Sequence, residues 1–127
     1  MPFDDFHLSV AVVTPALALV SVAGELDLYT AERLRAGLDE ASATGADRIV
    51  VDLSGISFIE STALGVLVQR AKRVAERGPT LALVSNDPRT LRVFEVTGLR
   101  RIFPMHATLH AALSDGSVPT PAGAEAA

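Results

Sequence analysis

Cysteine is absent from the 127-residue sequence, so disulfide bonds and thiolate metal sites are excluded. The absence also fits a reducing compartment. Positive charge is scarce as well, and the net charge of −4 argues against a nucleic-acid-binding protein, because phosphate contacts need a clustered positive surface. One basic cluster falls on a segment that we expect to be helical, and we interpret it as an ordinary solvated helix face. It consists of Arg70, Lys72, Arg73 and Arg77.

Long apolar runs are also missing. The longest apolar passage, Leu17 to Ala23, is far shorter than the roughly 20 residues that a helix needs to cross a bilayer. Near the N-terminus, Asp4 and Asp5 stand where a signal peptide would carry positive charge. These features predict a soluble cytoplasmic protein that does not insert into a membrane.

The common catalytic and nucleotide-binding motifs are absent, since the sequence has no G-x-S-x-G, P-loop or G-x-G-x-x-G pattern. His106 and His110 are spaced to share one helix face, but no third ligand lies at a suitable distance along the chain. We interpret them as ordinary histidines. Ser61 as a catalytic nucleophile lacks an identifiable base. We therefore expect a protein that is not an enzyme and that needs no metal or cofactor.

The segment from Arg48 to Gly78 is expected to form the centre of the fold, with a buried strand followed by a helix. Ile49 to Leu53 is a short apolar, β-branched run that is typical of a strand buried on both faces. Further along, apolar residues recur at three- and four-residue spacing, which predicts an amphipathic helix that stops at Gly78. The apolar stripe consists of Leu64, Leu67, Val68, Ala71, Val74 and Ala75.

Related patterns predict the elements on either side. Leu8 to Ala23 is typical of two antiparallel strands joined near Pro15, and Thr30 is the expected N-cap of a first helix. After the central helix we expect a strand at Thr80 to Ser85 and a helix capped by Asp87. A last strand at Arg101 to Phe103 and a last helix at Ala107 to Leu113 complete the set.

Alternating helices and strands predict an α/β fold. We expect a mixed, mainly parallel sheet with an N-terminal antiparallel hairpin and about four helices, layered on one face. Residues 1–113 should form this single domain. Residues 114–127 lack large apolar side chains and should form a disordered tail.

The start of the central helix carries the most informative chemistry. Glu60, Ser61 and Thr62 place two hydroxyls and a carboxylate where the first unbonded N–H groups of a helix point. Ser61 is open to two interpretations, an N-cap with a purely structural role or a phosphoacceptor. Phosphate would add a charge of about −1.5 to −2 at a helix end that favours anions, so the domain should tolerate it. A partner with an acidic or apolar surface docked there should not.

Two further features of this helix start have alternative explanations. Gly65 costs about 1 kcal/mol relative to alanine inside a helix, a cost that close approach of a neighbouring strand or of a partner would offset. Leu64 and Val68 fit either core packing or a docking surface.

The stretch VDLSGISFIESTALGVLV, residues 51–68, resembles the signature of STAS domains, specifically the bacterial anti-sigma-factor antagonists. Their usual form at this point is Asp-Ser-Ser/Thr-Gly-Leu-Gly. Further matches lie in the expected order and extend the resemblance over roughly residues 8 to 113. They are Gly24-Glu25-Leu26-Asp27 with Thr30 and Leu34, Asn86-Asp87-Pro88, and Phe94 with Thr97-Gly98-Leu99.

The resemblance implies partner switching. In such proteins the unphosphorylated antagonist binds an anti-sigma factor that is also a serine kinase, phosphorylation breaks the complex, and a PP2C-type phosphatase restores it. Carried over by position, the phosphoacceptor is Ser61, with Asp27 at a strand end facing the site. The expected partner-binding residues are Asp27, Glu60, Ser61, Thr62, Ala63, Leu64, Gly65 and Val68.

Two residues depart from the family pattern, because Glu60 replaces its aspartate and Ala63 replaces its first glycine. Glu60 moves the carboxylate out by one methylene, and Ala63 adds a methyl group where a kinase would need close access. These changes motivate the alternative hypothesis, a STAS scaffold or subunit that is not phosphorylated and binds constitutively to a partner such as a transporter ATPase.

Overall fold

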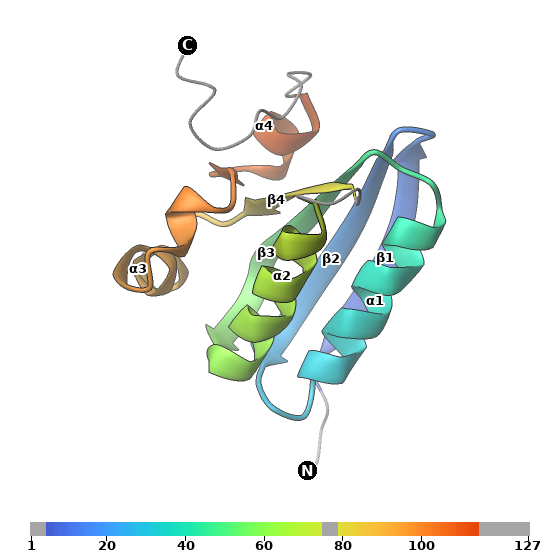
Figure 1. The fold of residues 1–127 in the computed structure, drawn as a ribbon. Helices are drawn as coiled ribbons and strands as arrows, with labels where there is room; N and C mark the ends of the chain where they lie inside the picture. The colour runs from blue at the N-terminus through green and yellow to red at the C-terminus, as the bar shows by residue number, and fades with distance from the viewer. Residues whose placement is uncertain (1–4, 75–78, 115–127) are drawn as a thin grey trace.

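One mixed sheet organises the computed structural model, which describes residues 5–74 and 79–114 (Figure 1). The strand order is β1-β2-β3-β4-β5, with β1 and β2 antiparallel and every later pair parallel, as the alternating pattern predicts. The strands are β1 (His7–Thr14), β2 (Leu17–Leu26), β3 (Arg48–Ile59), β4 (Thr80–Val84) and β5 (Met105–His106). The helices are α1 (Ala31–Ala43), α2 (Ser61–Val74), α3 (Pro88–Val96) and α4 (Leu109–Ser114), with a 3-10 turn at Leu99–Arg101.

The predicted hairpin is confirmed. A tight turn at Pro15 and Ala16 joins β1 to β2, and the Ala16 N–H donates to the Thr14 hydroxyl at 3.1 Å. Val10 faces Val20 across the pair. β1 lies at the edge of the sheet, β2 lies next to it and β3 is the central strand. The ends of β2 and β3 position the candidate functional site.

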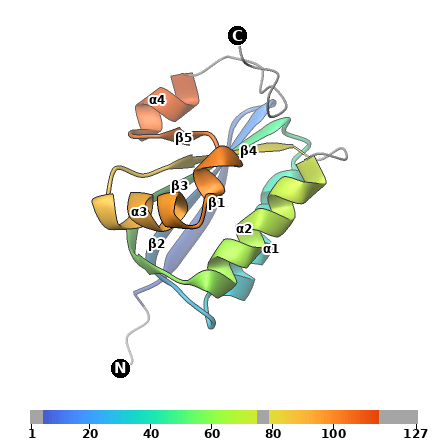
Figure 2. The same ribbon diagram turned by 60° about the vertical axis from the view of Figure 1, so that its left-hand side comes forward.

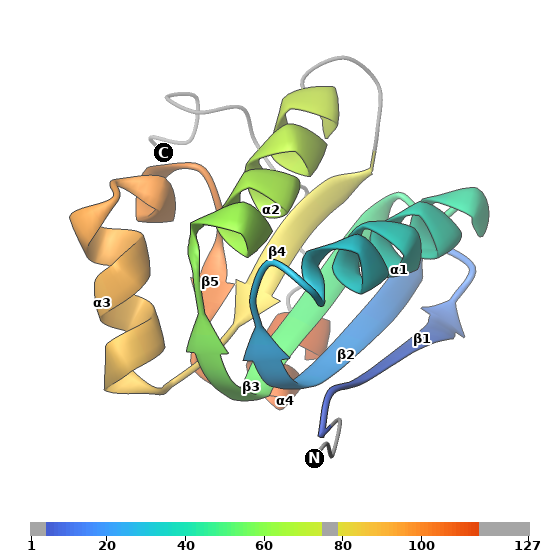
Figure 3. The same ribbon diagram turned by 90° about the horizontal axis from the view of Figure 1, so that it is seen from below.

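Helices cover both faces of the sheet. α1 and α2 lie on one face, α4 lies on the other, and α3 lies beside the β5 edge (Figures 2 and 3). Alternation along β2 explains the two layers, because Ala18 and Val20 pack in the main core while Leu17 packs in a second cluster with Val50 and Val84. The expectation that all helices share one face is therefore wrong for α4, whose Ala112 closes that second cluster.

β3 is longer than the predicted strand. It continues to Ile59, and between its pairings with Ser21 and Leu26 of β2 it contains two extra residues, one at each of two register shifts. Such bulges interrupt the two-residue alternation of a strand. As a result Leu53, Ile56 and Ile59 all face inward at three-residue spacing.

The first of these irregularities has a local cause. Asp52 accepts hydrogen bonds through Oδ1 from the Ser54 N–H at 2.9 Å and from the Ser54 hydroxyl at 2.6 Å. An aspartate that bonds two residues ahead mimics a backbone turn. The pair therefore fixes the bend just before Gly55, which pairs with Ala23.

The last strand differs from its predicted position. Arg101 to Phe103 was expected to be a strand, but Leu99–Arg101 forms a 3-10 turn after Gly98, whose φ of 76° lies in the left-handed region. Phe103 is 1% exposed and packs edge-on against Phe94, with ring centroids 6.1 Å apart. The chain joins the sheet only after that contact, when the Pro104 carbonyl accepts the Leu83 N–H at 2.9 Å.

Parts of three predictions lie outside the described residues. These are the helix stop at Gly78, the contribution of Ala75 to the apolar stripe, and residues 115–127 of the expected tail; Ser114 itself ends α4. Within 5–74 and 79–114, none of the helices combines the length and apolar character that crossing a membrane requires.

Candidate functional site

The site lies where β2 and β3 end side by side. Leu26 and Ile59 are register partners, and the Glu60 N–H donates to the Leu26 carbonyl at 3.0 Å. Because the strands are parallel, the residues that follow them emerge at the same edge of the sheet (Figure 3). Asp27 and Ser61, which the resemblance places together, therefore begin at one edge.

Ser61 is the first residue of α2 and is exposed. The first helical hydrogen bonds are donated by Ala63 and Leu64, both to the Glu60 carbonyl, at 3.1 and 3.2 Å. The N–H groups of Ser61 and Thr62 precede this ladder and point outward. The first turn holds no acidic side chain of its own. The predicted helix start is thus confirmed, and it leaves a partly positive end beside an exposed hydroxyl.

The N-cap interpretation of Ser61 does not hold, because Glu60 occupies the position that flanks the helix. Within the described part of the chain, no hydrogen bond occupies the Ser61 hydroxyl. The side chain is therefore available to an incoming group.

Thr62 and Gly65 share the exposed side of the first turns of α2. A Cβ added at Gly65 would meet no atom within 4 Å outside its own helix. Close approach of a neighbouring strand therefore does not explain this glycine. Approach of a partner stays a prediction.

Three of the expected partner-binding residues face the domain instead of the solvent. Ala63 is 0% exposed and Leu64 is 8% exposed, and both belong to the main core. Val68 is half-buried and packs against that core. The extra methyl group of Ala63 consequently points inward, which corrects the expectation that it obstructs access from outside.

Asp27 builds the turn between β2 and α1. Its Oδ1 accepts the N–H groups of Tyr29 and Thr30 at 2.9 and 3.0 Å, and its own N–H donates to the Thr30 hydroxyl at 2.9 Å. Thr30 stands at the predicted N-cap position but makes no side-chain cap bond, and its hydroxyl donates to the Glu25 carbonyl at 2.7 Å. Asp27 therefore fixes the turn that precedes α1, and Thr30 keeps the N-cap position without the cap bond expected of it.

Three exposed apolar side chains join this edge, and no pattern in the sequence predicts their exposure. Leu28 is 60% exposed, Tyr29 is 85% exposed and Phe58 is 48% exposed. Leu28 and Tyr29 lie in the turn after β2, and Phe58 lies at the end of β3, paired with Glu25. The sequence does carry one sign of this surface, since Leu28 and Tyr29 are large apolar residues in an otherwise polar turn. We call the surface formed by Leu28, Tyr29, Phe58, Ser61, Thr62 and Gly65 the edge patch.

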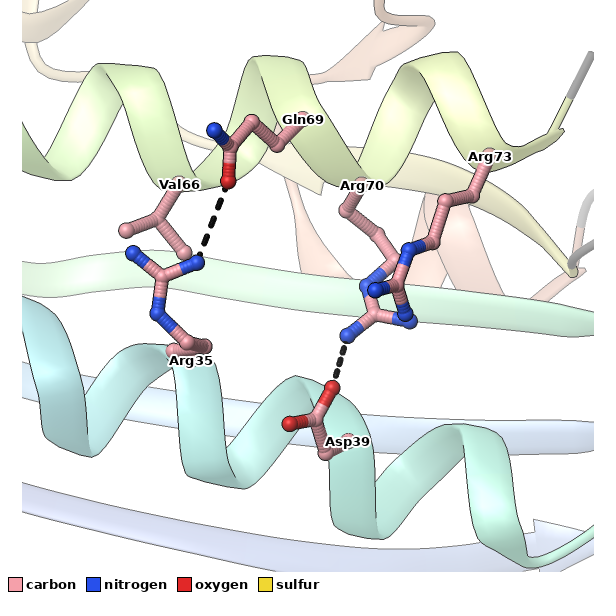
Figure 4. A pocket seen from close by; sticks show the side chains of 6 residues that line it. All are labelled: Arg35, Asp39, Val66, Gln69, Arg70 and Arg73. Carbon is pink, nitrogen blue, oxygen red and sulfur yellow. Dashed lines mark hydrogen bonds and ion pairs between the residues drawn. The ribbon is translucent and has the colours of Figure 1, made fainter.

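The basic cluster of α2 is not one solvated face. Arg70 is 7% exposed and donates hydrogen bonds to Asp39 and, at 3.2 Å, to Ser42 of α1 (Figure 4). The interpretation of Arg70 as a surface residue is therefore wrong, since a carboxylate on the neighbouring helix allows its burial. Lys72 and Arg73 are exposed, and Arg77 lies outside the described residues.

The histidine pair does not form the geometry of a metal site. His106 lies in β5 and His110 lies in α4, so they do not share one helix face. Across residues 5–74 and 79–114, no three potential His, Cys, Asp or Glu ligands gather closely enough to hold a metal ion.

Comparison with known proteins agrees with this arrangement. The family model of the STAS domain matches residues 9–112. The anti-sigma-B factor antagonist of Bacillus subtilis is 39% identical over 88 residues, which are 69% of this chain and 80% of that protein.

Solved structures of antagonists share the fold. The anti-sigma factor antagonist from Mycobacterium paratuberculosis superposes with a TM-score of 0.76 at 29% identity, covering 86% of this chain and 92% of that one. The Bacillus cell fate determinant SpoIIAA in its phosphorylated form superposes with a TM-score of 0.64 at 26% identity, covering 84% and 96%. The strand order, the helix that starts at the edge of the sheet and the matched span agree with one another, and this chain belongs to the STAS domain family.

Proposed function

We propose that this chain is an anti-sigma-factor antagonist that binds an anti-sigma factor with serine-kinase activity and is switched off by phosphorylation of Ser61. One observation carries the proposal: Ser61 is exposed at the first position of α2 and lies at the same sheet edge as the exposed Tyr29 and Phe58. The relatives that carry the name of antagonists support the class of partner. The exchange of partners takes place in the cytoplasm.

The edge patch provides the docking surface. Tyr29 and Phe58 are large aromatic groups that project from a rigid edge, and buried aromatic anchors supply much of the affinity of protein interfaces. Gly65 leaves the α2 backbone open to close contact. Asp27 and Glu60 flank the patch with half-buried carboxylates. Ala63, Leu64 and Val68 support the patch from within.

Phosphorylation is chemistry that the kinase performs on this chain. The Ser61 Oγ attacks the γ-phosphorus of ATP bound to the anti-sigma factor, and its proton passes to a base of the kinase. The Oγ–P bond forms as the bond between the γ-phosphorus and the β–γ bridging oxygen breaks, leaving ADP. A PP2C-type phosphatase then hydrolyses the Oγ–P bond, which returns the Ser61 hydroxyl and inorganic phosphate.

The phosphate acts on binding and leaves the fold intact. At the start of α2 a dianion meets the N–H groups of Ser61 and Thr62 and the positive helix end, which stabilise it. In the complex, the partner would cover the edge patch and enclose the same charge in an apolar interface without a counter-charge. The desolvation cost of this burial would be high. The nearby carboxylates of Asp27 and Glu60 add repulsion.

The two departures from the family pattern are compatible with phosphorylation. The Ala63 side chain lies in the core, so it leaves the path to Ser61 open. Glu60 keeps its charge, and its backbone fixes the helix start through the bond to Leu26. These placements favour a switchable antagonist over the alternative of a STAS subunit that binds constitutively.

Incubation with an anti-sigma-factor serine kinase and Mg-ATP, followed by mass spectrometry, tests the proposal. We expect one phosphate on Ser61 in the wild type and in Thr62→Ala, and none in Ser61→Ala. Phosphate on another residue, or none, would remove the switch. Co-purification tests the partner class separately, because a transport complex in place of a kinase would favour the constitutive subunit.

A further inference from the structure

A small pocket between α1 and α2 gathers three arginine side chains on the helical face of the domain (Figure 4). Its volume is about 60 Å³. A water molecule needs at least about 10–15 Å³ of such space, so the pocket has room for several waters or for one tetrahedral oxyanion. The lining residues are Arg35, Asp39, Val66, Gln69, Arg70 and Arg73.

Positive charge exceeds negative charge in this pocket. Asp39 is the one carboxylate in its lining, and it already accepts a hydrogen bond from Arg70. Glu32 pairs with Arg35 from outside the lining, at 3.4 Å and with its own side chain 76% exposed. Within the described part of the chain, Arg73 has no ion-pair partner. Among residues 5–74 and 79–114, the ion pairs therefore leave one of the three guanidinium charges without a carboxylate.

Two of the three arginines, Arg35 and Arg70, are held in place before any ligand arrives. The Arg70 side chain is 8% exposed and is fixed by Asp39 and Ser42. Arg35 Nη1 donates to Gln69 Oε1 at 3.1 Å across the two helices. Figure 4 shows the Arg73 side chain extending toward the Arg70 guanidinium. Such pre-organisation lowers the entropy that a ligand must remove on binding.

We infer that this pocket binds an oxyanion of the phosphate class, either inorganic phosphate or the phosphate group of a nucleotide. Guanidinium groups offer paired N–H donors that match phosphate oxygens, and an anion between Arg35 and Arg73 would relieve the repulsion between adjacent like charges. The pocket is independent of the edge patch. Arg70 lies nine residues beyond Ser61 in α2, about 13 Å along the helix axis, so a phosphate on Ser61 would not reach it.

Substitution of Asp39 distinguishes a phosphate-binding pocket from a simple ion-pair network. Its carboxylate competes with an incoming anion for Arg70, so Asp39→Asn should strengthen phosphate binding even though it weakens the contact between the helices. If the pocket served only as an ion-pair network, Asp39→Asn would weaken the contact between the helices without strengthening phosphate binding. Added phosphate should therefore raise the melting temperature of Asp39→Asn more than that of the wild type.

Amide chemical shifts from NMR titrations test the site with two probes, inorganic phosphate and ATP, each against sodium chloride of equal ionic strength. We expect saturable shifts around Arg35, Gln69 and Arg73. Affinity should fall about tenfold in Arg35→Gln and Arg73→Gln, because each removes charge-assisted hydrogen bonds. Arg92→Gln removes an arginine of α3 outside this pocket and should change the affinity less than about twofold.

Each outcome decides the question. Saturation by inorganic phosphate assigns a free-phosphate site, and saturation by ATP alone assigns a nucleotide phosphate. The inference is overturned if neither probe saturates, if chloride produces the same shifts, or if Arg92→Gln weakens binding as much as Arg73→Gln does. It is also overturned if Asp39→Asn, shown by circular dichroism to be folded, gains no affinity.

Discussion

The Glu60 N–H donates a hydrogen bond to the Leu26 carbonyl at 3.0 Å and thereby ties the start of α2 to the end of β2. The turn after Leu26 is fixed in addition by three hydrogen bonds to the Asp27 carboxylate, from the N–H groups of Tyr29 and Thr30 and from the Thr30 hydroxyl. The edge patch therefore rests on a bonded framework beneath its exposed side chains. Substitution of those side chains should change binding while the fold is retained.

Ser61→Asp should separate binding from folding. A carboxylate at the first position of α2 is compatible with the helix end, so the free energy of unfolding should stay within about 0.5 kcal/mol of the wild type. Affinity for the anti-sigma factor should fall at least about tenfold, because the charge must be desolvated in the interface. Urea denaturation and calorimetric titration measure the two effects. Ser61→Ala is the control and should bind normally; equal loss in both variants would contradict a charge-based switch.

Gly65→Ala should act in opposite directions on stability and on binding. No atom outside the helix lies within 4 Å of the added methyl group, so the variant should gain about 0.5–1 kcal/mol of unfolding free energy from helix propensity. Binding to the anti-sigma factor should weaken, since the methyl group separates the helix backbone from the partner. Unchanged affinity in a stabilised variant would show that the partner does not approach Gly65.

Tyr29→Ala and Phe58→Ala should each cost about 1–3 kcal/mol of binding free energy, as expected for aromatic anchors of an interface. Tyr29 is 85% exposed, so its removal should leave the unfolding free energy almost unchanged. Val96→Ala provides the matched control, because Val96 is 72% exposed on α3 and lies outside the edge patch. Equal losses in all three variants would indicate a different docking surface.

The ion pair between Arg70 and Asp39 should respond asymmetrically to mutation. Asp39→Ala leaves a buried guanidinium without its carboxylate and should cost about 1.5–3 kcal/mol of unfolding free energy. Arg70→Met keeps the apolar stem and leaves Asp39 with a side chain that is 57% exposed, so it should cost less, about 1 kcal/mol. Urea unfolding of both variants measures the difference. A larger loss in Arg70→Met would mean that packing of the guanidinium outweighs its charge.

The cap of α3 should weaken in acid. The Arg89 N–H donates to the Asp87 carboxylate at 2.9 Å, and this bond, aided by the Arg89 guanidinium, holds the pKa of Asp87 below its ordinary value of 3.8. A lowered folded-state pKa stabilises the protein above the ordinary pKa, and that stability is lost as the pH falls through the lowered value. Asp87→Asn keeps an acceptor that does not titrate. The difference in melting temperature between the wild type and Asp87→Asn should be constant above about pH 5. It should change below about pH 4, where the Asp87 carboxylate of the wild type takes up a proton.

The parts of the fold that depend on local pattern could be predicted from the sequence. The turn at Pro15, the cap at Asp87 and the start of α2 at Ser61 each follow from residues that are close in the chain. The second half of β3 could not be predicted, because its two bulges produce the three-residue spacing of Leu53, Ile56 and Ile59, which does not look like a strand.

Long-range contacts account for the remaining differences. Burial of Arg70 depends on Asp39, which lies 31 residues earlier and comes into reach only when α1 and α2 pack together. Phe103 leaves the predicted strand because it packs on Phe94. For the site, Ser61 and Asp27 could be placed from the motif alone. Exposure of Tyr29 and Phe58 depends on where the ends of two strands meet.

The two extra residues of β3 also limit how this chain can change during evolution. One residue deleted between Ser54 and Phe58 would exchange the inward Ile59 with the outward Phe58 and would rotate the following helix by about 100° relative to the sheet. Ser61 would then turn away from its neighbours at the edge. Homologous chains should accordingly differ in this stretch by substitution and keep the same number of residues.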